Sequence, residues 1–167
     1  MRQPRFLLPT ALSLSAALAL PTALADSVSC AGTITGKTVR GDLKVAPGRT
    51  CTVVNSRIEG DVEFERGSRL VMRNSTVTGS VEGEGYAQAS LSGTLIQGDL
   101  SLERGQGGTL RNNRVRGDVE FAGNRGRLAF AANAVGGDLE CGSNRWTYSF
   151  YDNSVGGRQQ GQCLNWK

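Results

Sequence analysis

A Gly-Asp pair returns along this 167-residue chain at an almost fixed interval. Successive glycines of the pair are separated by 19, 19, 19, 19, 20 and 20 residues. The glycines are Gly41, Gly60, Gly79, Gly98, Gly117, Gly137 and Gly157, and Ser80 and Arg158 stand in place of Asp after Gly79 and Gly157. A constant period near twenty residues predicts a solenoid, in which each repeat forms one coil and buries its apolar side by stacking on its neighbours.

Apolar residues hold fixed positions around each glycine, and neighbouring apolar positions differ by two residues. This alternation is typical of strands, and no stretch shows the 3.6-residue period of a helix. The position two residues after the glycine holds Leu43, Val62, Val81, Leu100, Val119 and Leu139. We therefore predict an all-β, single-domain parallel β-helix of about seven coils, each 19–20 residues long with three short strands. The apolar positions lack the strict hexads of a left-handed β-helix, which favours a right-handed solenoid, and the main alternative is an antiparallel sandwich.

Polar residues also recur at fixed positions. Asp follows the glycine at Asp42, Asp61, Asp99, Asp118 and Asp138. We expect each Asp to cap its own turn by accepting backbone N–H bonds, with calcium binding along the column as the alternative. Asn and Ser recur four and five residues before the glycine, where they suit turns and can bond along the solenoid axis. We expect the glycine itself to occupy a bend that a Cβ atom would strain.

The N-terminal residues 1–25 have the features of a secretory signal peptide. Arg2 and Arg5 precede an apolar stretch from Leu7 to Leu20, and Ala23 and Ala25 form the small-x-small cleavage site. Cleavage would leave residues 26–167 as the β-helix domain, with no membrane segment, in the periplasm or outside the cell. The net charge of +4 falls to +2 without the two arginines, and it is no signature of nucleic-acid binding.

Four cysteines lie in two pairs, each separated by about one coil. One coil along the chain is one step along the stack, which is within disulfide reach. Of the three possible pairings, only Cys30–Cys51 with Cys141–Cys163 avoids joining opposite ends of the solenoid. Export would place the cysteines in an oxidising compartment, where each bond would fasten one end of the solenoid. The chain has no His and no CxxC motif, so we expect neither a metal nor another cofactor.

The outward positions carry charge and could support chemistry. Two acidic columns are formed by Glu63, Glu82, Glu120 and Glu140, and by Glu65, Glu84 and Glu103. Paired carboxylates can hydrolyse glycosides, so a polysaccharide-active enzyme is one hypothesis. Coils of 19 residues leave little chain for the loops that build a catalytic cleft, so we favour a protein with no catalytic residues. Outward arginines are expected at Arg57, Arg73, Arg111 and Arg114, and Trp146 and Tyr151 are candidates for stacking on a sugar.

The unit Val115–Phe121, with the sequence VRGDVEF, resembles the repeats of bactofilin-like polymer-forming proteins over about residues 34–157. The resemblance implies a bacterial β-helix that assembles end to end. Bactofilins are cytosolic and lack paired cysteines, whereas this chain has an apparent signal peptide and four cysteines. We therefore expect a non-enzymatic, exported structural or binding protein of the bacterial periplasm or exterior. Its partners would be envelope polysaccharide or another protein and its state monomeric, with a fibre-forming protein as the alternative.

Overall fold

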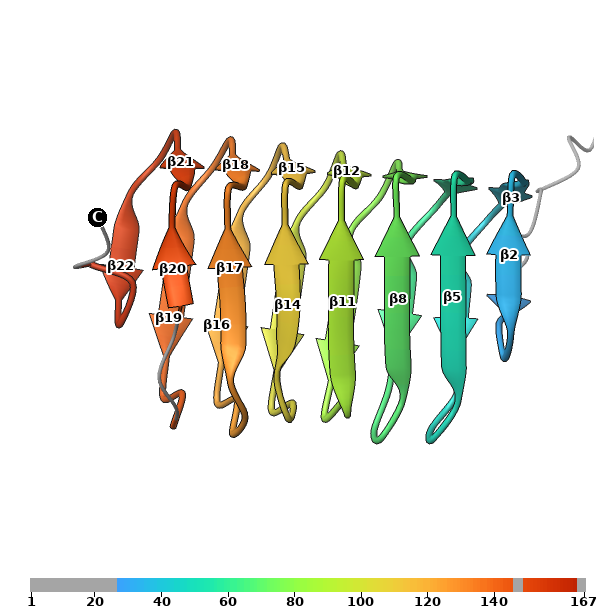
Figure 1. Ribbon diagram of the computed structural model, residues 1–167, viewed down its shortest axis with the longest axis horizontal. Helices are drawn as coiled ribbons and strands as arrows, with labels where there is room; N and C mark the ends of the chain where they lie inside the picture. The colour runs from blue at the N-terminus through green and yellow to red at the C-terminus, as the bar shows by residue number, and fades with distance from the viewer. Residues whose placement is uncertain (1–26, 146–148, 165–167) are drawn as a thin grey trace, which may run out of the picture.

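A computed structural model describes residues 27–145 and 149–164. Its strands assemble into three parallel sheets that run the length of a solenoid of about seven coils (Figure 1). Sheet 1 contains β1 (Val28–Ser29), β4 (Leu43–Val45), β7 (Val62–Phe64), β10 (Val81–Glu84), β13 (Leu100–Glu103), β16 (Val119–Ala122), β19 (Leu139–Gly142) and β22 (Gln159–Gly161). The predicted all-β solenoid is confirmed.

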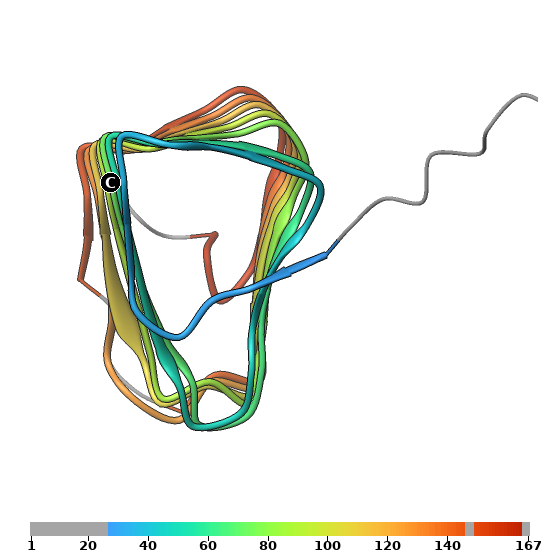
Figure 2. The same ribbon diagram turned by 90° about the vertical axis from the view of Figure 1, so that its right-hand side faces the viewer.

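The other two sheets complete each coil. Sheet 2 contains β2 (Thr33–Thr35), β5 (Thr50–Val54), β8 (Arg69–Arg73), β11 (Gln88–Ser92), β14 (Gly108–Arg111), β17 (Leu128–Ala131) and β20 (Ser149–Tyr151). Sheet 3 contains β3 (Thr38–Arg40), β6 (Arg57–Glu59), β9 (Thr76–Val77), β12 (Leu95–Ile96), β15 (Arg114–Val115), β18 (Ala134–Val135) and β21 (Ser154–Val155). Viewed along the axis, the sheets enclose a three-sided core (Figure 2).

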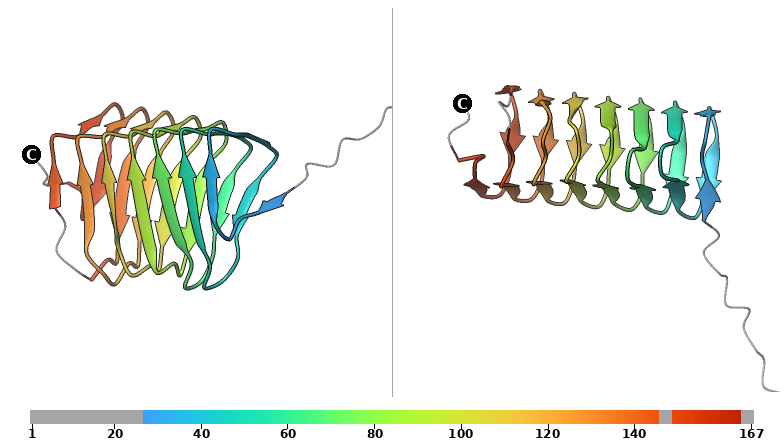
Figure 3. Two further views of the ribbon diagram at one scale, coloured as in Figure 1. Left: turned by 45° about the vertical axis from the view of Figure 1, so that its right-hand side comes forward. Right: turned by 90° about the horizontal axis from the view of Figure 1, so that it is seen from below.

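The coil is right-handed. In Figure 1 the strands of sheet 2 run upward at the front, sheet 3 crosses the top, and the strands of sheet 1 run downward behind. The chain meanwhile advances from right to left, which is the sense of a right-handed screw. The coils stay in step along the whole stack (Figure 3), with Leu43, Val62 and Val81 as register partners in sheet 1.

The core follows the predicted inward columns. The column two residues after each glycine is buried throughout, from Leu43 to Leu139. Phe121, Phe130 and Phe150 form an aromatic cluster near the C-terminal end, with ring centroids 5.3–6.1 Å apart. Because the alternation has a period of two, these burials fix the outward direction of the residues between them.

Both predicted disulfides are present. Cys30–Cys51 joins the first coils, with Cα atoms 5.5 Å apart, and Cys141–Cys163 joins the last, with Cα atoms 5.3 Å apart. All four cysteine side chains lie in the core. Each bond therefore links adjacent coils at one end of the solenoid.

A column of left-handed residues lies five positions before the glycines. Asn55, Asn74 and Asn112 have φ of 48°, 47° and 54°, and Ala132 has φ of 53°. Asn tolerates this region because its side chain bonds to nearby backbone, whereas Ala gains no such bond.

Replacing Ala132 with Asn should therefore raise the free energy of unfolding by about 0.5–1 kcal/mol. Asn55 and Asn74 already occupy this position in consecutive coils, so the new side chain has room. Thermal denaturation measures the gain. Ala134→Asn is the control, because Ala134 has no positive φ and lies in strand β18. An equal gain in both variants would rule out relief of backbone strain as the cause.

Candidate functional site

The Asp column forms a hydrogen-bond ladder between coils. Asp42 Oδ1 accepts the N–H of Asp61, and Asp99 Oδ1 accepts the N–H of Asp118, at N–O distances of 3.0 and 2.8 Å. Ser80 Oγ accepts the N–H of Asp99 in the same way, which explains how Ser replaces Asp in that coil. Each bond thus reaches the following coil, so the prediction that Asp caps its own turn was wrong.

The glycines of the pair are required by this ladder. A Cβ atom on Gly117 would lie 2.0 Å from Asp99 Oδ1 and 2.9 Å from the carbonyl oxygen of Gly98. Only Gly41 of the seven has a positive φ, so a left-handed bend does not explain the other six. The glycine leaves space for the carboxylate of the previous coil, and the Gly-Asp pair is therefore a single packing unit repeated along the axis.

The ladder bears on the calcium hypothesis. One oxygen of each of the five carboxylates is bound to a backbone N–H, and Asp138 also pairs with Arg158 through its second oxygen, at 3.1 Å. These contacts hold the pKa of Asp138 below its usual value, with the backbone bond from Arg158 as the main cause. Within residues 27–145 and 149–164, no group of three or more His, Cys, Asp or Glu side chains is arranged to hold a metal ion.

The predicted acidic columns lie on the outer face of sheet 1. Glu63 and Glu82 are register neighbours, as are Glu120 and Glu140, with Ser101 between the two pairs. Next to them, Glu84 and Glu103 are neighbours in β10 and β13. A shallow groove of about 290 Å³ runs between the columns, and its charged lining consists of Glu63, Glu65, Glu82, Glu84, Glu103 and Arg104. The carboxylates form a regular array along the coils.

Glu120 lies close to two other carboxylates of this array, Glu103 and Glu140. Partial burial raises its pKa, and repulsion from Glu103 and Glu140 raises it further. Lys44 lies at the N-terminal end of the same column, where its Nζ is 3.0 Å from Glu63 Oε2, and this contact raises the pKa of Lys44. The array is therefore neutralised at one end and carries unbalanced negative charge at Glu120.

Removing that charge should stabilise the fold at neutral pH. A raised pKa means that the folded state binds a proton more readily than the unfolded chain, so the ionised carboxylate lowers stability as pH rises. We expect Glu120→Gln to raise Tm by about 1–2 °C at pH 7, and the gain to vanish below about pH 4. Thermal melts across this pH range test it. Glu63→Gln should give no gain, because Glu63 has an ion pair to lose, and a gain in both variants would argue against repulsion.

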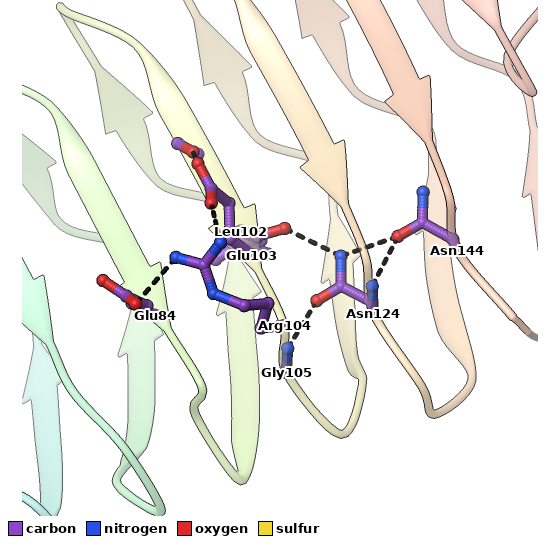
Figure 4. A network of polar contacts seen from close by, with 8 residues as sticks. Glu84, Leu102, Glu103, Arg104, Gly105, Asn124 and Asn144 are labelled. Atoms are coloured by element: carbon purple, nitrogen blue, oxygen red, sulfur yellow. Dashed lines mark hydrogen bonds and ion pairs between the residues drawn. The ribbon is translucent and has the colours of Figure 1, made fainter.

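Arg104 lies beside the acidic array in an unusual conformation. Its φ is 52°, a region that Gly85 and Gly123 occupy at the equivalent positions of adjacent coils. Its guanidinium group bonds to Glu84 and Glu103 at 2.7 and 3.1 Å (Figure 4). The hydrogen bond to Glu84 is the main cause that raises the pKa of Arg104, and the charge of Glu103 adds to it.

A buried amide network lies on the inner side of the same turn (Figure 4). Asn124 Oδ1 accepts the N–H of Gly105, and its Nδ2 donates to the carbonyl of Leu102 and to Asn144 Oδ1. Tyr86 Oη donates to Asn124 Oδ1 at 3.0 Å from two coils away, and burial raises the pKa of this phenol. This network was not predicted from the sequence, although the repeat of Asn at positions 124 and 144 was a visible signal.

The predicted Asn ladder near sheet 3 is also present. Asn133 Oδ1 accepts both the N–H and the Nδ2 of Asn113, and Asn153 does the same for Asn133. Each Nδ2 donates in addition to a strand carbonyl, such as that of Leu91 for Asn113. These side chains tie successive coils together along the axis.

The four predicted outward arginines differ in their partners. Arg57 pairs with Glu59 at 3.4 Å, whereas Arg73, Arg111 and Arg114 form no ion pair with a described residue. Arg111 instead donates to Tyr151 Oη at 2.6 Å, and its Cζ lies 5.6 Å from the centre of that ring. Tyr151 is 38% exposed, and Trp146, its proposed companion for sugar binding, lies outside the described residues.

No protein-family model, curated protein or solved structure matches this chain. The similarity to bactofilin-like proteins therefore has no support beyond the repeat motif on which it was based. Within the described ranges we find no helical segment with the length and apolarity that a bilayer crossing requires.

Proposed function

We propose that this protein is a non-enzymatic structural or binding protein, exported to the bacterial periplasm or cell exterior. The observation that carries the proposal is the presentation of side-chain columns that stay in register along a rigid stack. Glu63 and Glu82 form part of one such column on sheet 1, and Arg73 and Arg111 recur two coils apart on sheet 2. A polymer with its own repeat can contact such a surface at many equivalent points.

Rigidity supports this role, since a binding array must keep its spacing. Disulfides close both ends, and the Asp and Asn ladders bond each coil to the next. Among the described residues, no buried side-chain nitrogen or oxygen lacks a hydrogen-bond partner. A surface held in this way loses little conformational entropy when it binds.

Export is supported by two features. Residues 1–25 have the composition of a signal peptide, and they lie outside the described residues. The two disulfides are compatible with secretion into an oxidising compartment.

The ends of the ladders support a monomer. Arg158 takes the place of Asp in the last coil, and Lys37 takes the place of Ser or Asn in the first. Neither side chain can accept a hydrogen bond, so a second copy stacked on either end would leave backbone N–H groups without their ladder acceptors. We expect light scattering of the oxidised protein to show no fibres, and ready fibre growth would favour the polymer-forming alternative.

The competing function is polysaccharide hydrolysis by the acidic array, and the raised pKa of Glu120 is the observation that favours it. A screen of glycans and envelope components for binding, with a parallel assay for hydrolysis, separates the two. Binding without turnover supports our proposal. Turnover that Glu120→Gln abolishes would replace it with the enzymatic one, and absence of binding to every component would reject it.

A further inference from the structure

Positive and negative charge are divided between the two broad faces of the solenoid. The seven strands of sheet 2 contain no Asp or Glu, and their charged residues are Arg69, Arg73 and Arg111. Sheet 1 carries the acidic array, and Figure 1 shows the two sheets at the front and back of the molecule. An anionic ligand would therefore meet favourable charge on sheet 2 and repulsion on sheet 1.

A groove of about 510 Å³ opens on sheet 2 where the repeat lengthens from 19 to 20 residues. Its polar lining includes Gln88, Gln106, Thr109, Arg111 and Arg127, and no carboxylate lines it. Gly107 and Gly108 form part of the lining and contribute no side chains that would fill it. The groove thus combines two guanidinium groups with amide and hydroxyl groups that can bond to a ligand.

Arg111 is held in place without being neutralised. Arg111, Ala131 and Tyr151 are register partners in successive coils of sheet 2. Ala131 is 1% exposed although it points outward, as expected if the Arg111 and Tyr151 side chains meet across it. The guanidinium is bonded to a neutral phenol, so its positive charge remains available to a ligand.

We propose that this groove binds an acidic polysaccharide, an inference that rests on the binding function proposed above and names its ligand. Arg111 and Arg127 would pair with carboxylate or sulfate groups, and Gln88 and Thr109 would bond to hydroxyl groups. The exposed ring of Tyr151 offers a surface for a sugar ring beside Arg111. Arg73 lies two coils before Arg111, about 10 Å at sheet spacing, and extends the basic face along a linear ligand.

The alternative partners fit these features less well. Single-stranded nucleic acid is bound by several exposed aromatic side chains that stack on successive bases, and Tyr151 is the one exposed aromatic residue in the described part of the chain. A second copy of this chain would offer the acidic face of sheet 1. On that face Lys44 and Arg104 already neutralise part of the negative charge, which weakens its attraction to the groove.

The test is a binding titration of the oxidised protein against polygalacturonate, heparin, neutral dextran and single-stranded DNA. We expect binding to one or both acidic glycans, no binding to dextran, and weaker binding as salt rises. Arg111→Gln and Arg127→Gln should each weaken the affinity about tenfold or more, because each removes charge-assisted hydrogen bonds. Arg57→Gln is the matched control on sheet 3, and its affinity should equal that of the wild type.

Each other outcome overturns a defined part of the proposal. Unchanged affinity in the Arg111 and Arg127 variants would reject the groove while leaving the general binding function in place. Equal binding of dextran, or tighter binding of DNA than of either acidic glycan, would reject the ligand class. Self-association that Arg111→Gln relieves would assign the groove to a second copy. If the wild type bound neither these ligands nor any component of the glycan and envelope screen, the proposed binding function itself would be rejected.

Discussion

Replacing Val119 with Asp should unfold the protein at room temperature or lower its Tm by more than about 20 °C. Val119 lies in β16 near the middle of the stack, is 1% exposed, and has Leu100 and Leu139 as register partners. A carboxylate there would be buried without a partner, which costs several kcal/mol, against a typical domain stability of about 5–15 kcal/mol. Circular dichroism during heating and urea titration measures the loss.

Val71→Asp is the control for this result. Val71 lies in β8 of sheet 2, is only partly buried, and has its neighbours Leu70 and Met72 pointing inward on either side. The same substitution on the outer face should cost less than about 1 kcal/mol. If both variants had the same Tm, or if the Tm of Val119→Asp lay within a few degrees of the wild-type value, burial of the inward column would not be what holds the coils together.

The fold could be predicted because two periods act together. The 19–20-residue repeat fixes which residues stack, and the two-residue alternation fixes which of them point inward. A shift of one residue in β16 would bring Glu120 into the core in place of Val119, so one register is strongly favoured. The disulfides followed from the same argument, since Cys30 and Cys51 are one coil apart.

The contacts that were missed join different residue types at equivalent positions of the stack. Tyr86 and Asn124 lie 38 residues apart, which is two coils of 19, but this position holds Tyr, Gly and Asn in successive coils, so no recurring residue type marks it. The role of Asp99 was misjudged for a related reason, because its acceptor bond lies between coils and local turn rules describe only its own turn. The division of charge between the faces was also not predicted. The side of the solenoid on which a column lies depends on the bends that join the strands, and the sequence does not give their angles.

Large side chains in one coil are matched by glycine in the next, a pattern that the repeat alone did not reveal. A Cβ atom on Gly83 would lie 2.3 Å from the Phe64 ring, its register partner. A Cβ atom on Gly105 would lie 2.1 Å from the Tyr86 ring. The two rings also pack against each other, with centroids 5.2 Å apart. Each aromatic ring therefore occupies the space that the next coil leaves empty.

Gly105→Ala should consequently lower the free energy of unfolding by about 3 kcal/mol or more, toward the upper end of overpacking effects. Gly105 does not have a positive φ, so Ala can adopt its backbone conformation and the cost is steric. Tyr86 is fully buried and bonded to Asn124, so its ring cannot move aside. Gly142→Ala is the control, because a Cβ atom there meets nothing within 4 Å, and it should be near neutral in urea denaturation.

Removal of the ring should reverse the effect of the Ala substitution. Tyr86→Ala alone should cost about 3–5 kcal/mol by leaving a cavity. In that background Gly105→Ala places a methyl group in the vacated space, and the double variant should be as stable as Tyr86→Ala or slightly more stable. Urea denaturation of the wild type, the two single variants and the double variant gives the coupling energy. An equal cost for Gly105→Ala in both backgrounds would show that the Tyr86 ring is not the obstacle and that the backbone of Gly105 carries the constraint.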